Sequence, residues 1–227
     1  EGSIIVQGII APSILPYLML LPMIFGIMRE GIPVREFFTF RFLLSYLLFA
    51  LLFAVTNSIG NSLTSIGFSL ERDNFEYLKV LPIDMKKYAR EKFKVLFLTQ
   101  SSVPILSLSI VLLVLRMPIL LALTVLVTWF SISFGLSAWG FERDYRLRVT
   151  NWSNIVELQS RGNKFLLGFL MFILFMLLIL CIAVSFPIIH FLPETIGYLI
   201  GAAAFIILNG LGLFFGEFYL RKLKKAL

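Results

Sequence analysis

Residues 165–189 read FLLGFLMFILFMLLILCIAVSFPII, and this run contains no charged side chain. An α-helix rises about 1.5 Å per residue and the hydrocarbon core of a bilayer is about 30 Å thick, so the run is long enough to cross a membrane. It lacks the alternation of apolar and polar residues that marks a barrel strand. The run therefore predicts a transmembrane α-helix.

Five further stretches of the chain are comparably long and apolar. Together with the first, the predicted spans are about 4–28, 42–68, 95–115, 119–141, 165–189 and 196–220. Only Arg116-Met117-Pro118 separates the third and fourth spans, which predicts a tight helical hairpin. We predict an all-α integral membrane protein in which residues 1–227 form a single domain with six transmembrane helices and short amphipathic helices in its loops. Because the chain begins at Glu1 rather than Met, we expect it to be part of a longer polypeptide.

The composition of the whole chain supports a membrane protein. Of its 227 residues, 59% are hydrophobic and 15% are charged, whereas a soluble domain has roughly 25% charged residues. A soluble domain of this size could not bury so much apolar surface, which excludes a soluble enzyme, a disordered chain and a nucleic-acid reader. We therefore expect membrane lipid, and no nucleic acid, among the partners of this chain, despite its net charge of +7.

The distribution of Lys and Arg predicts the orientation of the spans. Three segments, 72–94, 143–164 and 221–225, hold 16 of the 20 basic residues, and in a six-span chain they lie on the same side. The positive-inside rule places that side, and with it both termini, in the cytoplasm. The sequence thus predicts a multi-pass protein of the cytoplasmic membrane with a first cytoplasmic segment at 69–94 and a second cytoplasmic loop at 142–164.

The first cytoplasmic segment predicts two helices. Residues 71–81 fit a short amphipathic helix, in which Phe75, Leu78 and Leu81 gather on one side. Pro82 ends that helix, and Asp84 caps a second, basic helix that begins at Met85 and leads into the third span. The first helix could rest on anionic lipid headgroups or dock a cytoplasmic partner.

The second span is unusually polar. Asn57, Asn61 and Ser65 are spaced four residues apart, so they fall near one face of a helix, and Gln100 lies near the start of the third span. Such side chains are costly toward lipid. They could line the cytoplasmic half of a translocation cavity, or they could form hydrogen bonds between packed helices.

The sixth span carries two patterns of small residues. Gly197 and Gly201, and likewise Gly212 and Gly216, are four residues apart, which predicts close packing of this helix on a neighbour. Near its end, Glu217 and Arg221 are spaced for an ion pair at the membrane interface. At the start of the second span, we expect Arg41 to reach the outer interface with its long side chain.

The chain has few of the residues from which catalytic and metal sites are built. His190 is the single histidine and Cys181 the single cysteine, which excludes metal sites built from clustered His or Cys. The sequence contains neither a GxSxG motif nor a GxxxxGK(S/T) phosphate-binding loop. We therefore expect no catalytic site, metal or cofactor in this chain, and ATP hydrolysis, if it drives the protein, belongs to another subunit.

The order of several motifs along the chain resembles that of a known family. Ser69-x-Glu71, then Phe75, then Leu78-Lys79-x-Leu81-Pro82-Ile83 before a basic run resembles the permease subunits of ATP-binding-cassette (ABC) exporters of the second type. Asp144, Arg148, Asn151-Trp152 and Asn163 are similar to that family's pattern between the fourth and fifth spans. Relatives often have Gly-Lys where this chain has Arg72-Asp73, and Pro where it has Val149.

The resemblance implies a function for the chain. It implies a permease that moves a hydrophobic or amphiphilic substrate, such as a peptide, out of the cell. A separate cytoplasmic ABC ATPase would bind ATP and Mg, and a second permease half or copy would complete the transporter. By resemblance, residues 71–81 are the coupling helix. The docking residues that it implies are Glu71, Phe75, Leu78, Lys79, Leu81, Pro82, Asp144, Arg148 and Trp152.

Two other classes of membrane protein stay open at this point. A non-transporting scaffold or sensor subunit needs no feature that the sequence lacks. A secondary transporter needs ionisable residues inside the membrane, and the predicted spans lack them apart from residues at their edges such as Arg41 and Glu217.

Overall fold

The computed structural model describes residues 38–59, 63–71, 74–151 and 164–227. Every regular element in these ranges is a helix, which confirms the all-α fold class. The first predicted span, 4–28, lies outside the described residues, so the prediction of six spans stays open there.

Five α-helices of the described chain correspond to predicted spans and a sixth, α4, precedes the third span, and three 3₁₀ turns lie before and after α3. The elements are η3 (Phe40–Phe42), α3 (Leu43–Ile59), η4 (Leu63–Ile66), η5 (Ser69–Glu71), α4 (Asn74–Val80), α5 (Met85–Val114), α6 (Ile119–Arg146), α8 (Lys164–Phe191) and α9 (Glu194–Ala226). Of the described residues, four stretches are long and apolar enough to cross a membrane: Phe40–Glu71, Met85–Val114, Ile119–Arg146 and Glu194–Ala226. A shorter apolar stretch, Met176–Phe191, lies in α8.

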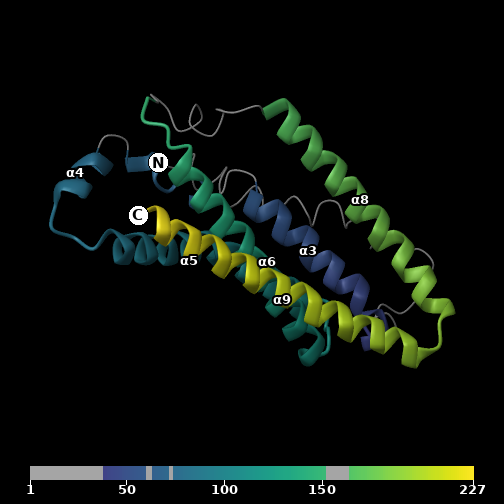
Figure 1. Cartoon of the computed structure of the whole chain (residues 1–227). Helices are drawn as coiled ribbons and strands as arrows, with labels where there is room; N and C mark the ends of the chain where they lie inside the picture. The colour runs from purple at the N-terminus through teal and green to yellow at the C-terminus, as the bar shows by residue number, and fades with distance from the viewer. Residues whose placement is uncertain (1–37, 60–62, 72–73, 152–163) are drawn as a thin grey trace.

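The helices form an elongated bundle with α6 between α9 and α3 (Figure 1). α8 packs on the other side of α3, where the Ser45 and Ser185 hydroxyls form a buried hydrogen bond of 2.7 Å. α4, the start of α5 and the ends of α6 and α9 lie at one end of the bundle. We call this the basic end, because the start of α5 and the ends of α6 and α9, which lie there, carry many of the Lys and Arg residues predicted to share one side of the membrane.

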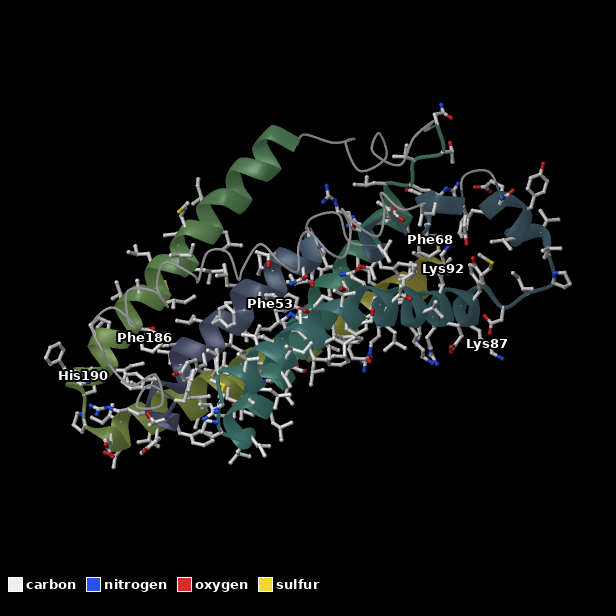
Figure 2. All side chains as sticks on the ribbon, turned by 180° about the vertical axis from the view of Figure 1, so that it is seen from behind. Phe53, Phe68, Lys87, Lys92, Phe186 and His190 are labelled. Atoms are coloured by element: carbon white, nitrogen blue, oxygen red, sulfur yellow. The ribbon has the colours of Figure 1, made fainter. Side chains whose placement is uncertain are left out.

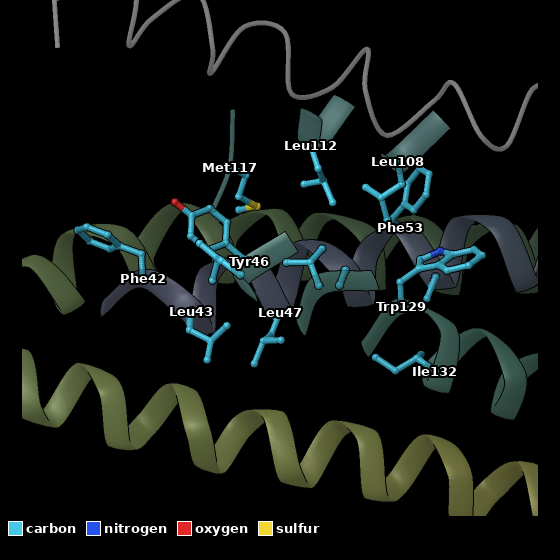
Figure 3. Close-up of a cluster of buried hydrophobic side chains, with 14 of the residues drawn as sticks. Phe42, Leu43, Tyr46, Leu47, Phe53, Leu108, Leu112, Met117, Trp129 and Ile132 are labelled. Carbon is cyan, nitrogen blue, oxygen red and sulfur yellow. The ribbon is translucent and has the colours of Figure 1, made fainter. Parts of the chain in front are cut away.

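The main core lies toward the opposite end, where α3, α5 and α6 meet (Figure 3). Phe53 of α3 and Trp129 of α6 are almost completely buried, and their ring centroids are 6.1 Å apart. Leu108 and Leu112 of α5 close the cluster from a third side. In lipid, dense packing rather than escape from water holds such contacts, so large complementary side chains suit this core.

The second predicted span is not one continuous helix. α3 ends at Ile59, and residues 63–71 form the short turns η4 and η5. The stretch Phe40–Glu71 is long and apolar enough to cross a membrane, which agrees with the span predicted over 42–68, but its described second part forms 3₁₀ turns instead of α-helix. Ser and Thr side chains in this stretch compete for backbone hydrogen bonds, which favours 3₁₀ turns over α-helix at residues 63–71.

The helices observed in the segment 69–94 agree in part with those predicted from the sequence. Asp84 caps α5 as predicted, since its carboxylate accepts hydrogen bonds from the backbone N–H groups of Lys86 and Lys87, at 2.9 and 3.2 Å. The preceding helix is shorter than the predicted 71–81, because Ser69–Glu71 is a 3₁₀ turn and α4 covers only Asn74–Val80.

Arg41 lies at the end opposite the basic end and forms hydrogen bonds with the protein backbone. Its guanidinium donates to the carbonyl oxygens of Ile189, His190 and Leu192, at 3.3, 2.6 and 2.7 Å. Ile189 and His190 belong to the last turn of α8 and Leu192 follows it, where carbonyl groups lack the i+4 donors of a continuing helix. Arg41 therefore caps α8 and fixes the α8–α9 turn on η3. The sequence predicted only that its side chain reaches the outer interface and did not predict this cap.

The paired glycines of the sixth span do pack closely, as predicted. A Cβ atom on Gly212 of α9 would lie 2.5 Å from the carbonyl oxygen of Ser131 in α6, and one on Gly201 would lie 2.8 Å from Leu43 Cβ. All four glycines of the two patterns are buried. The missing side chains therefore let α9 approach the α6 backbone over one half of its length and α3 over the other.

We predict that Gly212→Ala lowers the free energy of unfolding by about 1–3 kcal/mol, because the added methyl group meets backbone rather than a movable side chain. Gly210→Ala is the matched control, since a Cβ atom at Gly210 has no neighbour within 4 Å. The control should leave stability unchanged or raise it slightly through helix propensity. Unfolding of the purified protein in detergent measures both, and equal effects of the two substitutions would contradict the close packing.

Candidate functional site

The carboxylate of Asp144 connects two segments that are far apart in the sequence. It lies in the last turn of α6, where it is buried. Its Oδ2 accepts hydrogen bonds from the backbone N–H groups of Phe68 and Ser69, at 2.6 and 3.0 Å, and its Oδ1 accepts one from the Ser69 hydroxyl. Asp144 thus holds the start of η5 against the end of α6.

The Ser69 hydroxyl bridges a third segment. While it donates to Asp144, its oxygen accepts a hydrogen bond from the backbone N–H of Val149, at 3.1 Å. Val149 belongs to the chain that leaves α6, so one small side chain joins η5, α6 and the segment after it. A buried hydroxyl that both donates and accepts has little freedom to reorient.

Glu71 joins η5 to the first turns of α5. Its Oε1 accepts hydrogen bonds from the Lys92 ammonium and the Tyr88 hydroxyl. The Lys92 nitrogen also lies 5.5 Å from the centre of the Phe68 ring, which suits a cation–π contact. Figure 2 shows Lys92 beside Phe68. The Glu71 and Lys92 side chains are only 16% and 15% exposed, so water screens this ion pair less than a surface pair.

Phe75 fixes α4 on the bundle. The ring is fully buried, packs edge-on against Phe68 with centroids 5.3 Å apart, and lies beneath the guanidinium of Arg148 at 4.6 Å. Arg148 also forms an ion pair with Glu76 of α4. We call the connected side chains of Phe68, Ser69, Glu71, Phe75, Lys92, Asp144 and Arg148 the clasp.

The clasp determines which side of α4 is left uncovered. Tyr77 is 72% exposed, Val80 85% and Leu81 52%, and these three residues follow the i, i+3, i+4 spacing of one helical face. We call Tyr77, Val80 and Leu81 the α4 surface. It is an apolar patch at the basic end, on a seven-residue helix that lies outside the long apolar helices.

The predicted docking residues thus fall into two groups. Phe75 is buried and Leu78 is half-buried in the same aromatic cluster, whereas Leu81 and Pro82 are exposed. Glu71, Asp144 and Arg148 belong to the clasp, so they position α4 rather than extend its exposed surface. Lys79 lies on α4, and Trp152 lies outside the described residues.

Sequence reasoning missed several residues of this region. Tyr77 and Val80 were not selected, although their spacing with Leu81 was visible in the sequence. The roles of Lys92 and Tyr88 had no signal, because their partner Glu71 lies about 20 residues away along an irregular path. Sequence reasoning also missed Glu142 in α6. This side chain is buried and forms ion pairs with Arg146 of its own helix and Lys222 of α9, at 2.8 and 3.2 Å.

The polar residues proposed to line a pathway are hydrogen-bonded within the chain. Gln100 is buried, its Oε1 accepts from the backbone and the hydroxyl of Thr64, and its Nε2 donates to the Asn57 carbonyl at 3.3 Å. Asn57 donates its amide to the Phe53 carbonyl at 2.7 Å. These contacts favour the alternative of helix packing for Asn57 and Gln100.

The other two pathway candidates add little to this choice. Ser65 is half-buried, and a Cβ atom on Gly140 of α6 would lie 3.4 Å from the Ser65 Cβ. Asn61 lies outside the described residues. A role of these residues in lining a translocation cavity stays a prediction. The expected ion pair of Glu217 and Arg221 is present, with Nε and Oε2 3.6 Å apart.

No protein-family model matches this chain, and no curated protein and no solved structure matches it either. Its function is therefore argued from the clasp and from the surface that the clasp leaves exposed.

We predict that Asp144→Ala destabilises the protein by about 2–4 kcal/mol, because it leaves the buried N–H groups of Phe68 and Ser69 without an acceptor. Hydrogen exchange should show faster exchange in residues 63–71, with little change in the core of α3. Glu217→Ala is the control, since it removes an acidic residue from an exposed ion pair and should cost less than about 1 kcal/mol. Unchanged protection of residues 63–71 in Asp144→Ala would contradict the role of Asp144.

Proposed function

We propose that this chain is the membrane permease component of an ABC exporter and that a separate cytoplasmic ATPase subunit docks on the α4 surface. The observation that carries the proposal is the α4 surface itself, a short apolar face that the clasp holds in a fixed position at the basic end. Tyr77 and Val80 are mostly exposed there, outside the long apolar helices. In water such a patch favours burial against a partner, at roughly 25 cal/mol per Å² of apolar surface.

The clasp supports the mechanical part of the proposal. A push on α4 by a partner would act on η5 through Phe75 and Phe68, on α5 through Glu71 and Lys92, and on α6 through Asp144. ATP and Mg would bind to the partner, whose change of shape would bias the bundle between two arrangements.

The substrate and the remaining partners follow from the resemblance together with the exposed surface. The bundle exposes large apolar side chains along α5, α8 and α9, which suit lipid or a second permease half or copy. We propose export of a hydrophobic or amphiphilic substrate, such as a peptide, across the cytoplasmic membrane. A scaffold, a sensor or a secondary transporter would have no need of an ATPase on the α4 surface, so the experiment below separates these classes.

We predict that an ABC ATPase co-purifies with the wild-type protein and that Val80→Asp abolishes this association. Burying a new carboxylate in an apolar contact is strongly unfavourable, so binding should weaken at least a hundredfold. Asn74→Asp is the control, because it adds the same charge to an exposed position on the same helix and should leave binding within about threefold. Both variants should unfold at the wild-type temperature, since neither side chain belongs to the clasp.

Three results would count against this proposal. Wild-type protein that retains no ATPase after purification in mild detergent would favour the scaffold or secondary-transporter class. ATPase binding that survives in Val80→Asp would exclude the α4 surface as the docking site. Equal loss in Asn74→Asp and Val80→Asp would point to general repulsion by negative charge instead of an apolar contact.

The proposed orientation has a test of its own. In a Cys181→Ala background, Tyr77→Cys should not react with a membrane-impermeant thiol reagent added to intact cells, because the basic end faces the cytoplasm. Arg116→Cys is the control, since Arg116 is exposed in the α5–α6 turn at the opposite end and should be labelled. Labelling of Tyr77→Cys without labelling of Arg116→Cys would reverse the orientation.

A further inference from the structure

The exposed face of α5 changes from basic to apolar along a single ridge. Residues spaced four apart along the helix form this ridge, which we call the α5 ridge: Lys86, Arg90, Lys94, Leu98, Ser102, Leu106 and Ile110. All seven side chains are exposed, and i, i+4 neighbours adjoin along a row that is inclined to the helix axis, so the ridge winds partly around α5. The first three are basic, and the others, apart from Ser102, are large and apolar.

The dimensions of the ridge match those of one leaflet. From Leu98 to Ile110 the helix rises about 18 Å at 1.5 Å per residue. One leaflet of the hydrocarbon core is about 15 Å thick, half of the bilayer core. Leu98, Leu106 and Ile110 are 62%, 62% and 58% exposed, so an acyl chain has continuous apolar surface to cover. The Ser102 hydroxyl is satisfied locally, because it donates to the Thr99 carbonyl at 2.8 Å.

The charge at the start of α5 separates into two groups. Lys92 faces the clasp and binds Glu71, so it contributes to the fold rather than to the surface. Figure 2 shows Lys87 on the far side of α5 from Lys92, where it adds to the charge near the ridge. Glu91 lies beside the ridge and forms an ion pair with Lys94 at 2.8 Å. Both side chains are 55% exposed, so this ion pair is weak and Lys94 can bind another anion in place of Glu91.

We propose that the α5 ridge binds an anionic phospholipid. The negatively charged headgroup would lie against Arg90 and Lys94, with Lys86 at its outer edge, and an acyl chain would run along Leu98, Leu106 and Ile110. A single ligand must match both the positive charge and the long apolar surface that continues from it along the inclined ridge, and an anionic lipid has both properties. An acidic soluble protein would match only the first. This site does not depend on the proposed transport function.

Native mass spectrometry of the purified full chain tests the site, with phosphatidylglycerol and phosphatidylcholine as probes of equal chain length. We expect the wild-type protein to bind phosphatidylglycerol at least tenfold more tightly. The variant Lys86→Gln/Arg90→Gln/Lys94→Gln should lose about a hundredfold in affinity for phosphatidylglycerol, since three basic residues near the headgroup are removed. Its affinity for phosphatidylcholine should stay within about threefold.

The control variant, Arg221→Gln/Lys224→Gln/Lys225→Gln, removes the same charge from the end of α9. It should keep phosphatidylglycerol binding within about threefold. An equal loss in both variants would overturn the ridge in favour of a diffuse positive field. Equal binding of the two lipids by the wild-type protein would overturn it as well, and so would binding of soluble polyglutamate as tight as that of phosphatidylglycerol.

A measurement on the wild-type protein does not depend on any variant folding. Raising the salt concentration from 0.1 to 0.5 M should weaken the binding of phosphatidylglycerol but not that of phosphatidylcholine.

Discussion

The hydrogen bonds that Asp144 accepts from Phe68 and Ser69 are the contacts on which the basic end depends. Backbone groups inside or near a bilayer need partners, and the chain between α3 and α4 is too irregular to supply them from its own helix. A carboxylate from α6 supplies them instead. Once η5 is fixed in this way, Phe75 can pack beneath Arg148, and the apolar face of α4 turns away from the bundle.

The same constraint explains the middle of the bundle. Gln100 of α5 forms hydrogen bonds both with the Asn57 carbonyl in α3 and with Thr64 in η4. Gln100, one of the residues that could line a pathway, therefore acts in the structure as a hydrogen-bond partner for the backbone of α3 and η4. Gly212 and Gly216 of α9 pack closely against α6, whereas Gly197 and Gly201 of the same helix pack against Arg41 and Leu43.

The sequence predicted the fold class and the limits of the long helices well, because lipid demands long apolar runs and because the Asp84 cap is a local signal. It could not predict the 3₁₀ turns at residues 63–71, since the average hydropathy stays high across that stretch. It selected Glu71, Phe75, Asp144 and Arg148 by resemblance, but contacts between residues about 70 positions apart were not visible. Nor could an amphipathic pattern reveal that Phe75 is buried while Leu81 is exposed.

A photo-crosslinking amino acid placed at Val80 tests the central proposal most directly, because it reports what covers the α4 surface in the native membrane. The proposed function predicts that mass spectrometry identifies an ABC ATPase as the crosslinked partner, and that the same residue placed at Asn74 captures much less of it. Crosslinks from Val80 to lipid or to an unrelated protein, with no ATPase among the products, would contradict the proposal.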